Sequence, residues 1–507
     1  MPGVVHGAVL VGVDATVVSV EVDLLRRLPS VAIVGLPSAS VREAAERVRS
    51  AILSSGMEFP RFRILISLAP ADLRKQGTGF DLPMAVAILV AAGRVPAERA
   101  ARWMLAGELS LGGEVRPVRG ALSIACAARD GGFGGVIVPR PCVEEAALVE
   151  GVDVRGVRTL AEAVAFLCGE GELEGASRGA VSRATDALDL RDVRGQEEAR
   201  FALEVAAAGG HNLLMEGPPG CGKTMLAARL PGILPPLSQS EAVECTRVHS
   251  AAGLRSGLGG VVSTRPFRAP HHSVSAAAMV GAADLRPGEA SLAHHGVLFL
   301  DEFPEFRRDV REALRAPLED RVVVLARAGG RVVFPANFAL VAAANPCPCG
   351  YWGHPTRPCL CSPSQRQRYR ASLSGPIVDR VDMRVELRPV EPARLFEGPG
   401  SEASEGSHAV RERVERCRLV QSARNGPGRT NASLGSDEVL QLADPRECAL
   451  RELVRHVEKR GTSARGARRL LRVSRTIADL GGAERVETEH IRAAISLRFD
   501  SDEEVVP

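Results

Sequence analysis

The sequence predicts an α/β fold whose central part is a doubly wound parallel sheet with a ligand site at one edge. Residues 212–215, 296–300 and 338–344 are short apolar runs, and each is followed by polar residues or a loop. Such runs are typical of strands buried on both faces, as in parallel sheets. The first run leads into a glycine-rich loop and then into a helical pattern at 225–230. Because ligands of doubly wound sheets bind at the carboxyl ends of the strands, the residues after these runs are the first candidates for a functional site.

Length and composition indicate a multidomain globular protein. At 507 residues the chain is long enough for about three domains, and its 45% hydrophobic and 25% charged content is that of a soluble protein. The net charge of +3 is too small to indicate a nucleic-acid partner, so any such partner must be argued from local patches. We find no signal-peptide pattern and no run of roughly 18 apolar residues, so we expect a cytoplasmic protein without a membrane span.

Changes of pattern along the chain divide it into five segments. Residues 1–170 alternate Val/Ile-rich strands with helical stretches and predict an α/β domain. Residues 171–186 have turn composition and predict a linker to a second α/β domain at 187–390. Residues 391–408 are polar and of low complexity, which predicts a mobile linker, and 409–507 are helical by apolar spacing. We expect helices at 409–423, 436–443, 446–458, 463–481 and 488–498.

The loop after the first buried strand matches the pattern G-x-x-x-x-G-K-[ST]. Its glycines let successive backbone N–H groups point at one anion, and the following helix adds the positive end of its dipole. Lys223 can reach the β- and γ-phosphates, and the Thr224 hydroxyl can bind Mg²⁺. A chance match is disfavoured because a strand and a helix flank the loop. We therefore predict a site for ATP and Mg²⁺ formed by Gly217, Pro218, Pro219, Gly220, Cys221, Gly222, Lys223 and Thr224.

Polar residues at the ends of the other two strands complete a hydrolytic site. Asp301 follows a buried strand and is the expected ligand of a Mg²⁺-bound water, and Glu302 is the expected base that polarises the attacking water. Asn345 ends the next buried run, which would place it between these elements to orient the water. Each residue alone also suits a structural strand end. Their order after a phosphate loop favours the catalytic interpretation.

Four cysteines form a separate cluster in a loop rich in proline and glycine. Cys347, Cys349, Cys359 and Cys361 make two C-x-C pairs that are separated by nine residues, in a segment that cannot build a core. Four thiolates at such spacing favour a structural Zn²⁺ site, with free or redox-active thiols as the alternative. A chain with 11 cysteines and no secretion signal is expected to keep them reduced, which favours metal over disulfides. His354 lies inside the loop and is surplus to a four-cysteine site.

Further blocks of sequence resemble those of a known family. Residues 265–275 resemble the helix-2 insertion of magnesium-chelatase-like AAA+ proteins, and 321–334 predict a hairpin just before the third strand. In the N-terminal domain, 75–85 and 107–118 resemble the two motif blocks of the Lon-protease C-terminal domain, which has a ribosomal-S5-like fold. With the phosphate loop, these blocks make nearly the whole chain similar to the ComM/YifB family of magnesium-chelatase-like AAA+ ATPases.

The resemblance implies an S5-like N-terminal domain, an AAA+ ATPase domain with an insertion and a hairpin, and a small α-helical lid. It also implies a hexameric ring that acts on DNA, as a branch-migration helicase in recombination and natural transformation. DNA in the ring's channel would be held through its phosphates, independently of sequence. For any one basic residue, an ordinary solvated side chain is an equal alternative. The candidates are Arg265, Arg268, Arg327 and Arg331, with His271 and His272.

The resemblance also assigns two arginines and marks one departure from the family. Arg380 lies in a block similar to the one that carries the finger by which a subunit completes its neighbour's site. Arg465 resembles the lid arginine that senses the nucleotide in the same subunit, with Arg468 and Arg469 as close alternatives. Cys221 stands where the family more often has serine. Cysteine is small and leaves the backbone donors intact, so we expect ATP binding to survive.

Protease activity is not expected of the N-terminal domain. A Lon-type protease needs a serine nucleophile and a lysine that takes its proton. Aligned on the resembling blocks, these positions fall on Gly79 and Leu122, neither of which can do the chemistry. We therefore predict a scaffold or docking domain.

Two other functions compete with a DNA motor. A metal-chelatase motor subunit would share the insertion and the ATP motifs. Against it, the first third of the chain resembles a Lon-like domain, and the sequence has no D-x-S-x-S motif for metal adhesion. A scaffold that binds ATP only for assembly is the other alternative. Glu302 argues against it, because a purely structural nucleotide site needs no positioned base.

Overall fold

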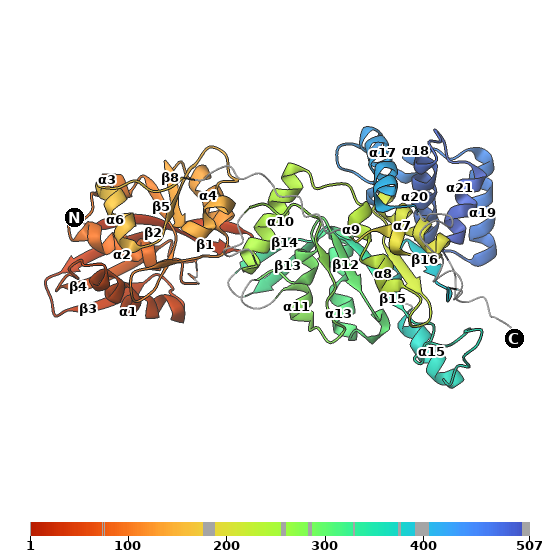
Figure 1. The fold of residues 1–507 in the computed structure, drawn as a ribbon, viewed down its shortest axis with the longest axis horizontal. Helices are drawn as coiled ribbons and strands as arrows, with labels where there is room; N and C mark the ends of the chain where they lie inside the picture. The colour runs from red at the N-terminus through yellow and green to blue at the C-terminus, as the bar shows by residue number, and fades with distance from the viewer. Residues whose placement is uncertain are drawn as a thin grey trace.

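The computed structural model describes residues 2–73, 75, 77–175, 188–254, 260–281, 286–327, 330–373, 377–390 and 405–498. Most of the predicted linker 171–186, residues 391–404 of the second linker, and Ser374 to Pro376 of the finger block lie outside the described residues. Figure 1 shows three bodies in a row: an N-terminal domain, a central α/β domain and a helical domain. No helix among the described residues is both long and apolar enough to cross a bilayer.

The N-terminal domain is built on a mixed seven-stranded sheet with the order β3-β4-β2-β1-β5-β8-β9. The strands β1 and β2 form a long antiparallel pair, whereas β5, β8 and β9 run parallel to one another. Alternate side chains of β1 are buried, and helices α2 and α4 cover the two faces of the sheet. The main elements are β1 (Gly3–Val11), β2 (Asp14–Leu25), β3 (Ser30–Val34), α1 (Ala39–Ser54), β4 (Arg63–Ala69), α2 (Asp81–Ala91), β5 (Trp103–Leu105), α4 (Ala121–Asp130), β8 (Gly135–Pro139), β9 (Asp153–Val157) and α6 (Leu160–Cys168).

The central domain contains the predicted parallel sheet. Its five strands have the order β11-β12-β15-β10-β16, and every neighbouring pair is parallel. The three strands expected from the apolar runs are its three central strands. The sheet consists of β10 (Leu213–Glu216), β11 (Phe267–Arg268), β12 (Val297–Leu300), β15 (Ala339–Ala344) and β16 (Met383–Glu386).

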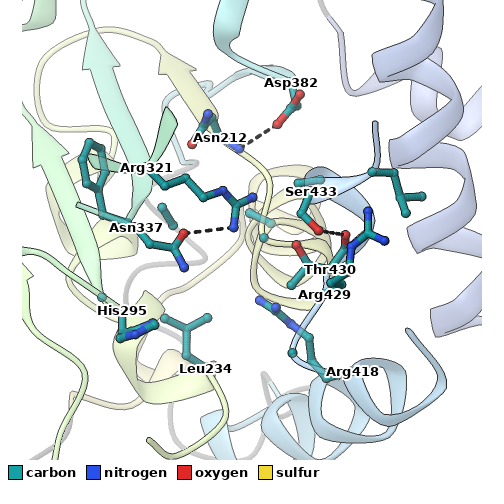
Figure 2. A pocket seen from close by; sticks show the side chains of 18 of the residues that line it. Asn212, Leu234, His295, Arg321, Asn337, Asp382, Arg418, Arg429, Thr430 and Ser433 are labelled. Atoms are coloured by element: carbon teal, nitrogen blue, oxygen red, sulfur yellow. Dashed lines mark hydrogen bonds between the residues drawn. The ribbon is translucent and has the colours of Figure 1, made fainter. Parts of the chain in front are cut away.

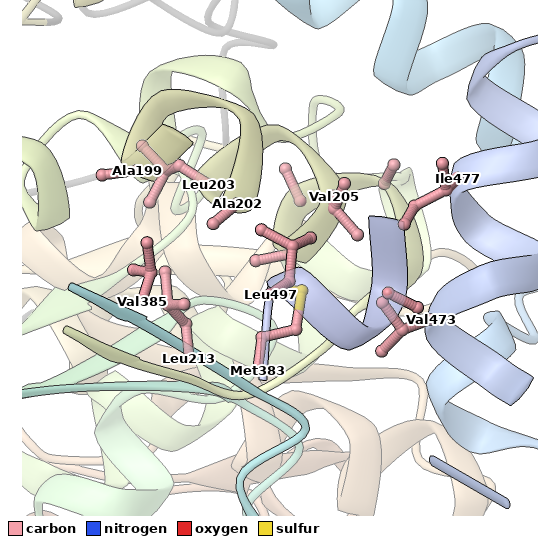
Figure 3. Packing of buried hydrophobic residues seen from close by; sticks show 14 of the residues in the cluster. Ala199, Ala202, Leu203, Val205, Leu213, Met383, Val385, Val473, Ile477 and Leu497 are labelled. Atoms are coloured by element: carbon pink, nitrogen blue, oxygen red, sulfur yellow. The ribbon is translucent and has the colours of Figure 1, made fainter. Parts of the chain in front are cut away.

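Helices cover both faces of this sheet because alternate strand residues point to opposite sides. Leu213 and Met215 of β10 join a core with α7, whereas Leu214 joins a second core on the other face. Figure 3 shows side chains of α7 filling the space between β10 and β16 on one side and α20 on the other. The helices are α7 (Glu197–Gly209), α8 (Lys223–Ala227), α9 (Leu230–Ile233), α10 (Gln239–Ala252), α11 (Ala276–Val280), α12 (Glu289–Leu292), α13 (Arg308–Ala313), α14 (Arg315–Asp320) and α15 (Pro363–Ser372).

The structure contains the hairpin that the sequence predicts, but part of the block that we expected to be an insertion is a strand of the sheet. The hairpin predicted at 321–334 is present as β13 (Val322–Arg327) paired antiparallel with β14 (Gly330–Pro335). The block 265–275, expected to be an insertion, contributes β11 to the sheet, because Phe267 pairs with Val297 of β12. A two-residue edge strand is too short to produce a recognisable apolar run, and the sequence therefore did not predict it.

The helical domain follows the predicted pattern of helices. Its long first helix α17 packs on α7 and α9, and α20 packs on α7, so the domain is attached to one face of the central sheet. The helices are α17 (Ser407–Asn425), α18 (Val439–Ala443), α19 (Glu447–Arg460), α20 (Ala464–Leu480) and α21 (Thr488–Ser496).

The N-terminal domain is packed directly against the central domain. Val13, in the turn between β1 and β2, is buried in the same core as Val332 and Phe334 of the hairpin. Beside it, the hydroxyl of Ser250 on α10 accepts a 2.9 Å hydrogen bond from the backbone of Gly120. In Figure 1 the β1 end of the N-terminal sheet lies next to the hairpin β13–β14. The two domains therefore share buried apolar and polar contacts.

A candidate nucleotide-binding site

The predicted phosphate loop connects the buried strand β10 to the short helix α8. Gly220 and Gly222 have φ of +80° and +95°, a region that L side chains rarely adopt, so glycine is required at both positions. The backbone oxygen of Cys221 accepts a 3.1 Å hydrogen bond from the Gln196 side chain, at the entry of α7. The loop thus has the backbone conformation that the sequence pattern requires. The residue that precedes α7, Gln196, holds it in place.

Lys223 joins the loop to the end of strand β15. Its Nζ donates hydrogen bonds to the backbone oxygens of Gly217 and Pro218 at 2.6 and 2.9 Å, and to Asn345 Oδ1 at 3.1 Å. The side chain is buried, and burial lowers the pKa of Lys223. The predicted phosphate-binding lysine and the predicted water-orienting asparagine therefore lie together.

Thr224 and Asp301 form a second contact across the loop. The hydroxyl of Thr224 donates a 2.8 Å hydrogen bond to Asp301 Oδ2, and Asp301 follows the last residue of β12. A hydroxyl and a carboxylate are hard oxygen ligands of the kind that Mg²⁺ prefers. The residues present therefore fit a Mg²⁺ ion bound beside the phosphate loop.

Glu302 adopts an unusual backbone conformation and contacts a histidine. Its φ of +51° is rare for a residue other than glycine, and its backbone N–H donates a 2.9 Å hydrogen bond to Asp301 Oδ1. Its carboxylate lies 3.2 Å from Nδ1 of His272, and half of the Glu302 side chain is exposed. His272, which sequence reasoning counted only as a DNA candidate, therefore lies at the hydrolytic site. Sequence reasoning missed this because it did not predict strand β11, whose pairing with β12 brings His272 close to Glu302.

The thiol of Cys221 is buried within the loop. Its Sγ lies 3.8 Å from Lys223 Nζ, and burial raises its pKa. A protonated, buried thiol is a poor nucleophile and is slowly oxidised. The substitution therefore behaves as a small apolar replacement.

Arg380 and Arg465 lie together at the opposite end of the sheet from the phosphate loop. The backbone oxygen of Arg380 accepts a 3.1 Å hydrogen bond from Asn212, which precedes β10, whereas the loop follows β10. Four strand residues separate these ends by about 13 Å. Glu319 Oε1 accepts from Arg380 Nη2 at 2.5 Å and from Arg465 Nη2 at 2.8 Å. Arg465 therefore contacts Glu319 beside Arg380, and its role as a lid sensor stays a prediction.

Both arginines line a cavity of about 890 Å³ between the central and helical domains. Among the described residues that line it, nine are arginines and four are acidic, and none belongs to the phosphate loop. Figure 2 shows Arg321 and Arg418 reaching toward it from the central domain and from α17. Burial lowers the pKa of Arg418 and of Arg469 to about 10. An anion in this cavity would offset the cost of burying these cations.

The four predicted DNA-contacting arginines differ in their surroundings. Arg265 is only 13% exposed and donates to the backbone oxygens of Pro235 and His295 at 2.5 and 2.7 Å. Arg268 forms a two-pronged contact with Glu289 at 2.6 and 2.8 Å. Arg331 is exposed on the hairpin, and the side chain of Arg327 lies outside the described residues. Arg265 and Arg268 therefore have structural partners already, which the sequence did not reveal.

The four clustered cysteines meet at one point. The Sγ atom of Cys347 lies 3.4 Å from that of Cys349 and 3.6 Å from that of Cys359, and all four sulfurs lie within 4.8 Å of one another. Four thiolates 2.3 Å from one Zn²⁺ would be about 3.8 Å apart. A backbone N–H of Tyr351 lowers the pKa of Cys349 to about 6, whereas burial raises the pKa of Cys347. The arrangement can hold a tetrahedral metal ion.

Comparisons with known proteins match every part of this architecture. Residues 189–395 match the family described as magnesium chelatase, subunit ChlI, and 20–141 and 404–498 match two further segments described for the same subunit. An uncharacterised protein of Mycobacterium tuberculosis is 45% identical over 494 residues, which is 96% of each chain. The chain belongs to the magnesium-chelatase-like family of AAA+ proteins that includes YifB and ComM.

Two named relatives of this family cover almost the same length. The protein YifB of Escherichia coli is 43% identical over 501 residues, which is 98% of this chain and 96% of YifB. The competence protein ComM of Haemophilus influenzae is 41% identical over 507 residues, which is 98% of this chain and 97% of ComM. The family predicted from the sequence is therefore confirmed. Membership in this AAA+ family also suggests an ATPase.

Proposed function

We propose that this protein is a Mg²⁺-dependent ATPase that forms a hexameric ring and moves along DNA, with branch migration in recombination and natural transformation as its task. The observation that carries the ATPase is the pair of hydrogen bonds from Lys223 to Asn345 and from Thr224 to Asp301, which joins the start of α8 to the residues that follow β12 and β15. The DNA substrate is supported by the resemblance to ComM, whose name refers to competence. Such a motor would work in the cytoplasm.

Each residue of the loop and strand ends has a role in the proposed hydrolysis. Lys223 binds the phosphates, and Thr224 and Asp301 hold Mg²⁺ and its water. The ion would neutralise charge on the phosphates of ATP. Glu302 takes the proton of the attacking water once it leaves His272, and Asn345 orients that water. Burial of the lysine strengthens its interaction with the phosphates, because the local dielectric is low.

The arginines at the far end of the sheet are proposed to act on a neighbouring subunit. Arg380 is too far along β10 from its own loop to reach a phosphate there, which suits a finger offered to the next subunit. Arg465 shares Glu319 with Arg380, so we assign it to the same neighbour rather than to the chain's own ATP. Both arginines would leave the carboxylate of Glu319 and contact the neighbour's γ-phosphate, where negative charge develops during hydrolysis.

The N-terminal domain is proposed to be a docking domain without protease activity. Leu122, at the position expected of the lysine, is fully buried, and its backbone N–H donates a 2.9 Å hydrogen bond to Glu145. Gly79, at the nucleophile position, has no side chain. The shared core around Val13 supports a role in holding the hairpin. ATP-stimulated cleavage of casein by the purified protein would overturn this assignment.

Zn²⁺ is proposed as a structural ion in the cysteine cluster. The convergence of Cys347, Cys349, Cys359 and Cys361 supports it, because thiolate sets of this kind close on one ion in small loops that lack a core. The ion would fix the segment that follows Asn345.

A metal-chelatase motor is the second candidate, and the described name of the matching family favours it. ATPase rates measured alone, with single-stranded DNA and with a four-way junction, separate the two candidates. We expect stimulation by DNA and ATP-dependent unwinding of a three-strand or four-way junction. Absence of both, in protein that hydrolyses ATP, would exclude the DNA motor.

A further inference from the structure

A small unit projects from the carboxyl end of strand β15. It comprises residues 346–373, which form the cysteine loop and helix α15, and we name it the cysteine-loop unit. Figure 1 shows α15 standing apart from the rest of the central domain, at the lower right. The helix begins at a capping box made by Ser362 and Gln365, with Pro363 in its first turn. The unit is therefore a defined structure on the surface.

Apart from its four cysteines, the cysteine-loop unit has charged side chains of one sign only. No aspartate or glutamate occurs between Asp320 and Asp379, whereas the unit carries four arginines. Three of these arginines are exposed, and the described residues show no carboxylate partner for them. The exposed arginines are Arg357, Arg368 and Arg370.

Aromatic rings hold two of the unit's arginines in place. The guanidinium of Arg366 lies 3.7 Å from the centre of the Trp352 ring. That of Arg357 lies 5.3 Å from the centre of the Tyr351 ring and donates a 3.0 Å hydrogen bond to its hydroxyl. Stacked guanidinium groups lose less conformational freedom when they bind a phosphate. At the tip of the loop, Leu360 is 87% exposed between two cysteines.

The base of the unit contacts the hydrolytic site. Tyr369 is buried on α15, which raises the pKa of its hydroxyl, and the nearby backbone N–H of Asn345 opposes this shift. Gly350 packs so closely on the phosphate loop that a Cβ there would lie 2.6 Å from Pro219 Cδ. A ligand that shifts α15 or the loop would therefore act on Asn345 and on the loop directly.

We propose that the cysteine-loop unit binds the phosphate backbone of DNA and transmits this contact to the ATP site. The proposal deepens the proposed DNA function and rests on it. A cationic surface without acidic residues, with planar guanidinium groups and an exposed apolar tip, has the composition of a single-strand binding surface. The cysteine-loop unit replaces Arg265 and Arg268 as the main candidate for DNA binding, because those two arginines already have carboxylate or backbone partners.

The test compares DNA binding of two matched double variants of the full chain. Arg368→Ala/Arg370→Ala removes two charges from the unit, and Arg26→Ala/Arg27→Ala removes two exposed charges from the loop before β3. Binding of a fluorescein-labelled oligo-dT strand is measured by anisotropy over a range of salt concentrations, with a non-hydrolysable ATP analogue. Basal ATPase without DNA reports whether each variant retains its fold.

Removing the two unit arginines should weaken binding about tenfold and lower the slope of log affinity against log salt by about 0.7 per arginine. The control variant should match the wild type, and only the unit variant should lose stimulation of its ATPase by DNA. Equal affinity and slope in both variants would overturn the inference and leave the DNA motor standing. A wild-type protein that binds no DNA would remove the proposed function itself.

Tryptophan fluorescence supplies an independent measurement. The chain has two tryptophans, so Trp103→Phe leaves Trp352 as the only reporter, beside Arg366 in the unit. DNA binding should change its emission. A protein that binds oligo-dT without any change of Trp352 emission would place the DNA elsewhere and overturn the inference.

Discussion

His272 Nδ1 lies 3.2 Å from Glu302 Oε2, which places the proposed catalytic base in contact with a histidine from the segment after the edge strand. Glu302 holds this contact with a φ of +51°. Strain of this kind is concentrated at sites where a residue must be held in one place or released. If Glu302 is the base, this contact would have to break before its carboxylate could take a proton from the attacking water.

Removal of the histidine should release the base. His272→Ala removes the 3.2 Å contact between its ring and the Glu302 carboxylate, and a partly exposed contact of this kind is worth up to about 1 kcal/mol, so basal ATP hydrolysis should rise by up to about fivefold. ATP affinity should stay the same, because the phosphate loop is untouched. Steady-state ATPase and nucleotide titration check this, and an unchanged or lower rate would contradict it.

Removal of the base itself should have the opposite effect. Glu302→Gln keeps the size of the side chain but cannot take a proton, so hydrolysis should fall by at least about a hundredfold while ATP still binds. Stopped-flow binding of a fluorescent ATP analogue, together with phosphate release, measures the two steps. Glu305→Gln, three residues away on the same loop, is the matched control and should hydrolyse normally.

Loss of the loop lysine should be a defect of binding. Lys223→Ala removes a buried cation that would meet the phosphates, and a charged hydrogen bond is worth about 1.5–3 kcal/mol, so ATP affinity should fall about 10- to 100-fold. Isothermal titration with ATP and Mg²⁺ measures it. Wild-type affinity in this variant would place the nucleotide elsewhere.

The arginine at the far end of the sheet should act between subunits. Arg380→Ala alone should bind ATP and hydrolyse it about a thousandfold more slowly, whereas mixing with Lys223→Ala subunits should restore part of the rate. Mixed rings then contain interfaces with one intact loop and one intact finger. Normal hydrolysis by a homogeneous Arg380→Ala protein would end the assignment.

The histidine pair beside α10 should make the central domain sensitive to acid. Burial, and then the neighbouring His295, lower the pKa of His294 from 6.5 to about 4. The unfolded chain takes up a proton below about pH 6.5 and the folded chain does not, so stability is lost as the pH falls from about 6.5 to about 4. Between pH 7 and pH 5 the loss should be about 2 kcal/mol.

The matched variant for this effect is His294→Gln. It should be less stable than the wild type at pH 7, because its contacts with Glu244 and Asn337 are altered, but its stability should change less between pH 7 and pH 5. Urea unfolding at the two pH values measures the difference. Equal pH dependence in the two proteins would show that another group titrates.

Local sequence patterns predicted the parts of the fold that are marked by apolar periodicity or by glycines in a recognisable loop pattern. The three central strands and the helices of the last domain have apolar periodicity, and the phosphate loop has glycines at its two positive-φ positions, Gly220 and Gly222. These features depend on neighbours in the sequence. They could therefore be read without knowing the tertiary structure.

The remaining features depend on long-range contacts. Strand β11 has only two residues, so its place in the sheet is set by pairing with β12 and not by its own sequence. The partners of Arg265, Arg268 and Arg465 are carboxylates or backbone oxygens distant in sequence, which no local pattern reveals. Whether an arginine is available for a ligand is a property of the folded chain.

Val13 and the hairpin residues Val332 and Phe334 share one buried core, and this has a consequence for the hairpin's movement. A hairpin that changed position during the ATP cycle would have to carry the turn between β1 and β2 along, or expose these side chains to water. Work done at the nucleotide site would then displace an entire domain of about 170 residues. A chain shortened to begin after that domain would lose the cover of this core and tend to aggregate.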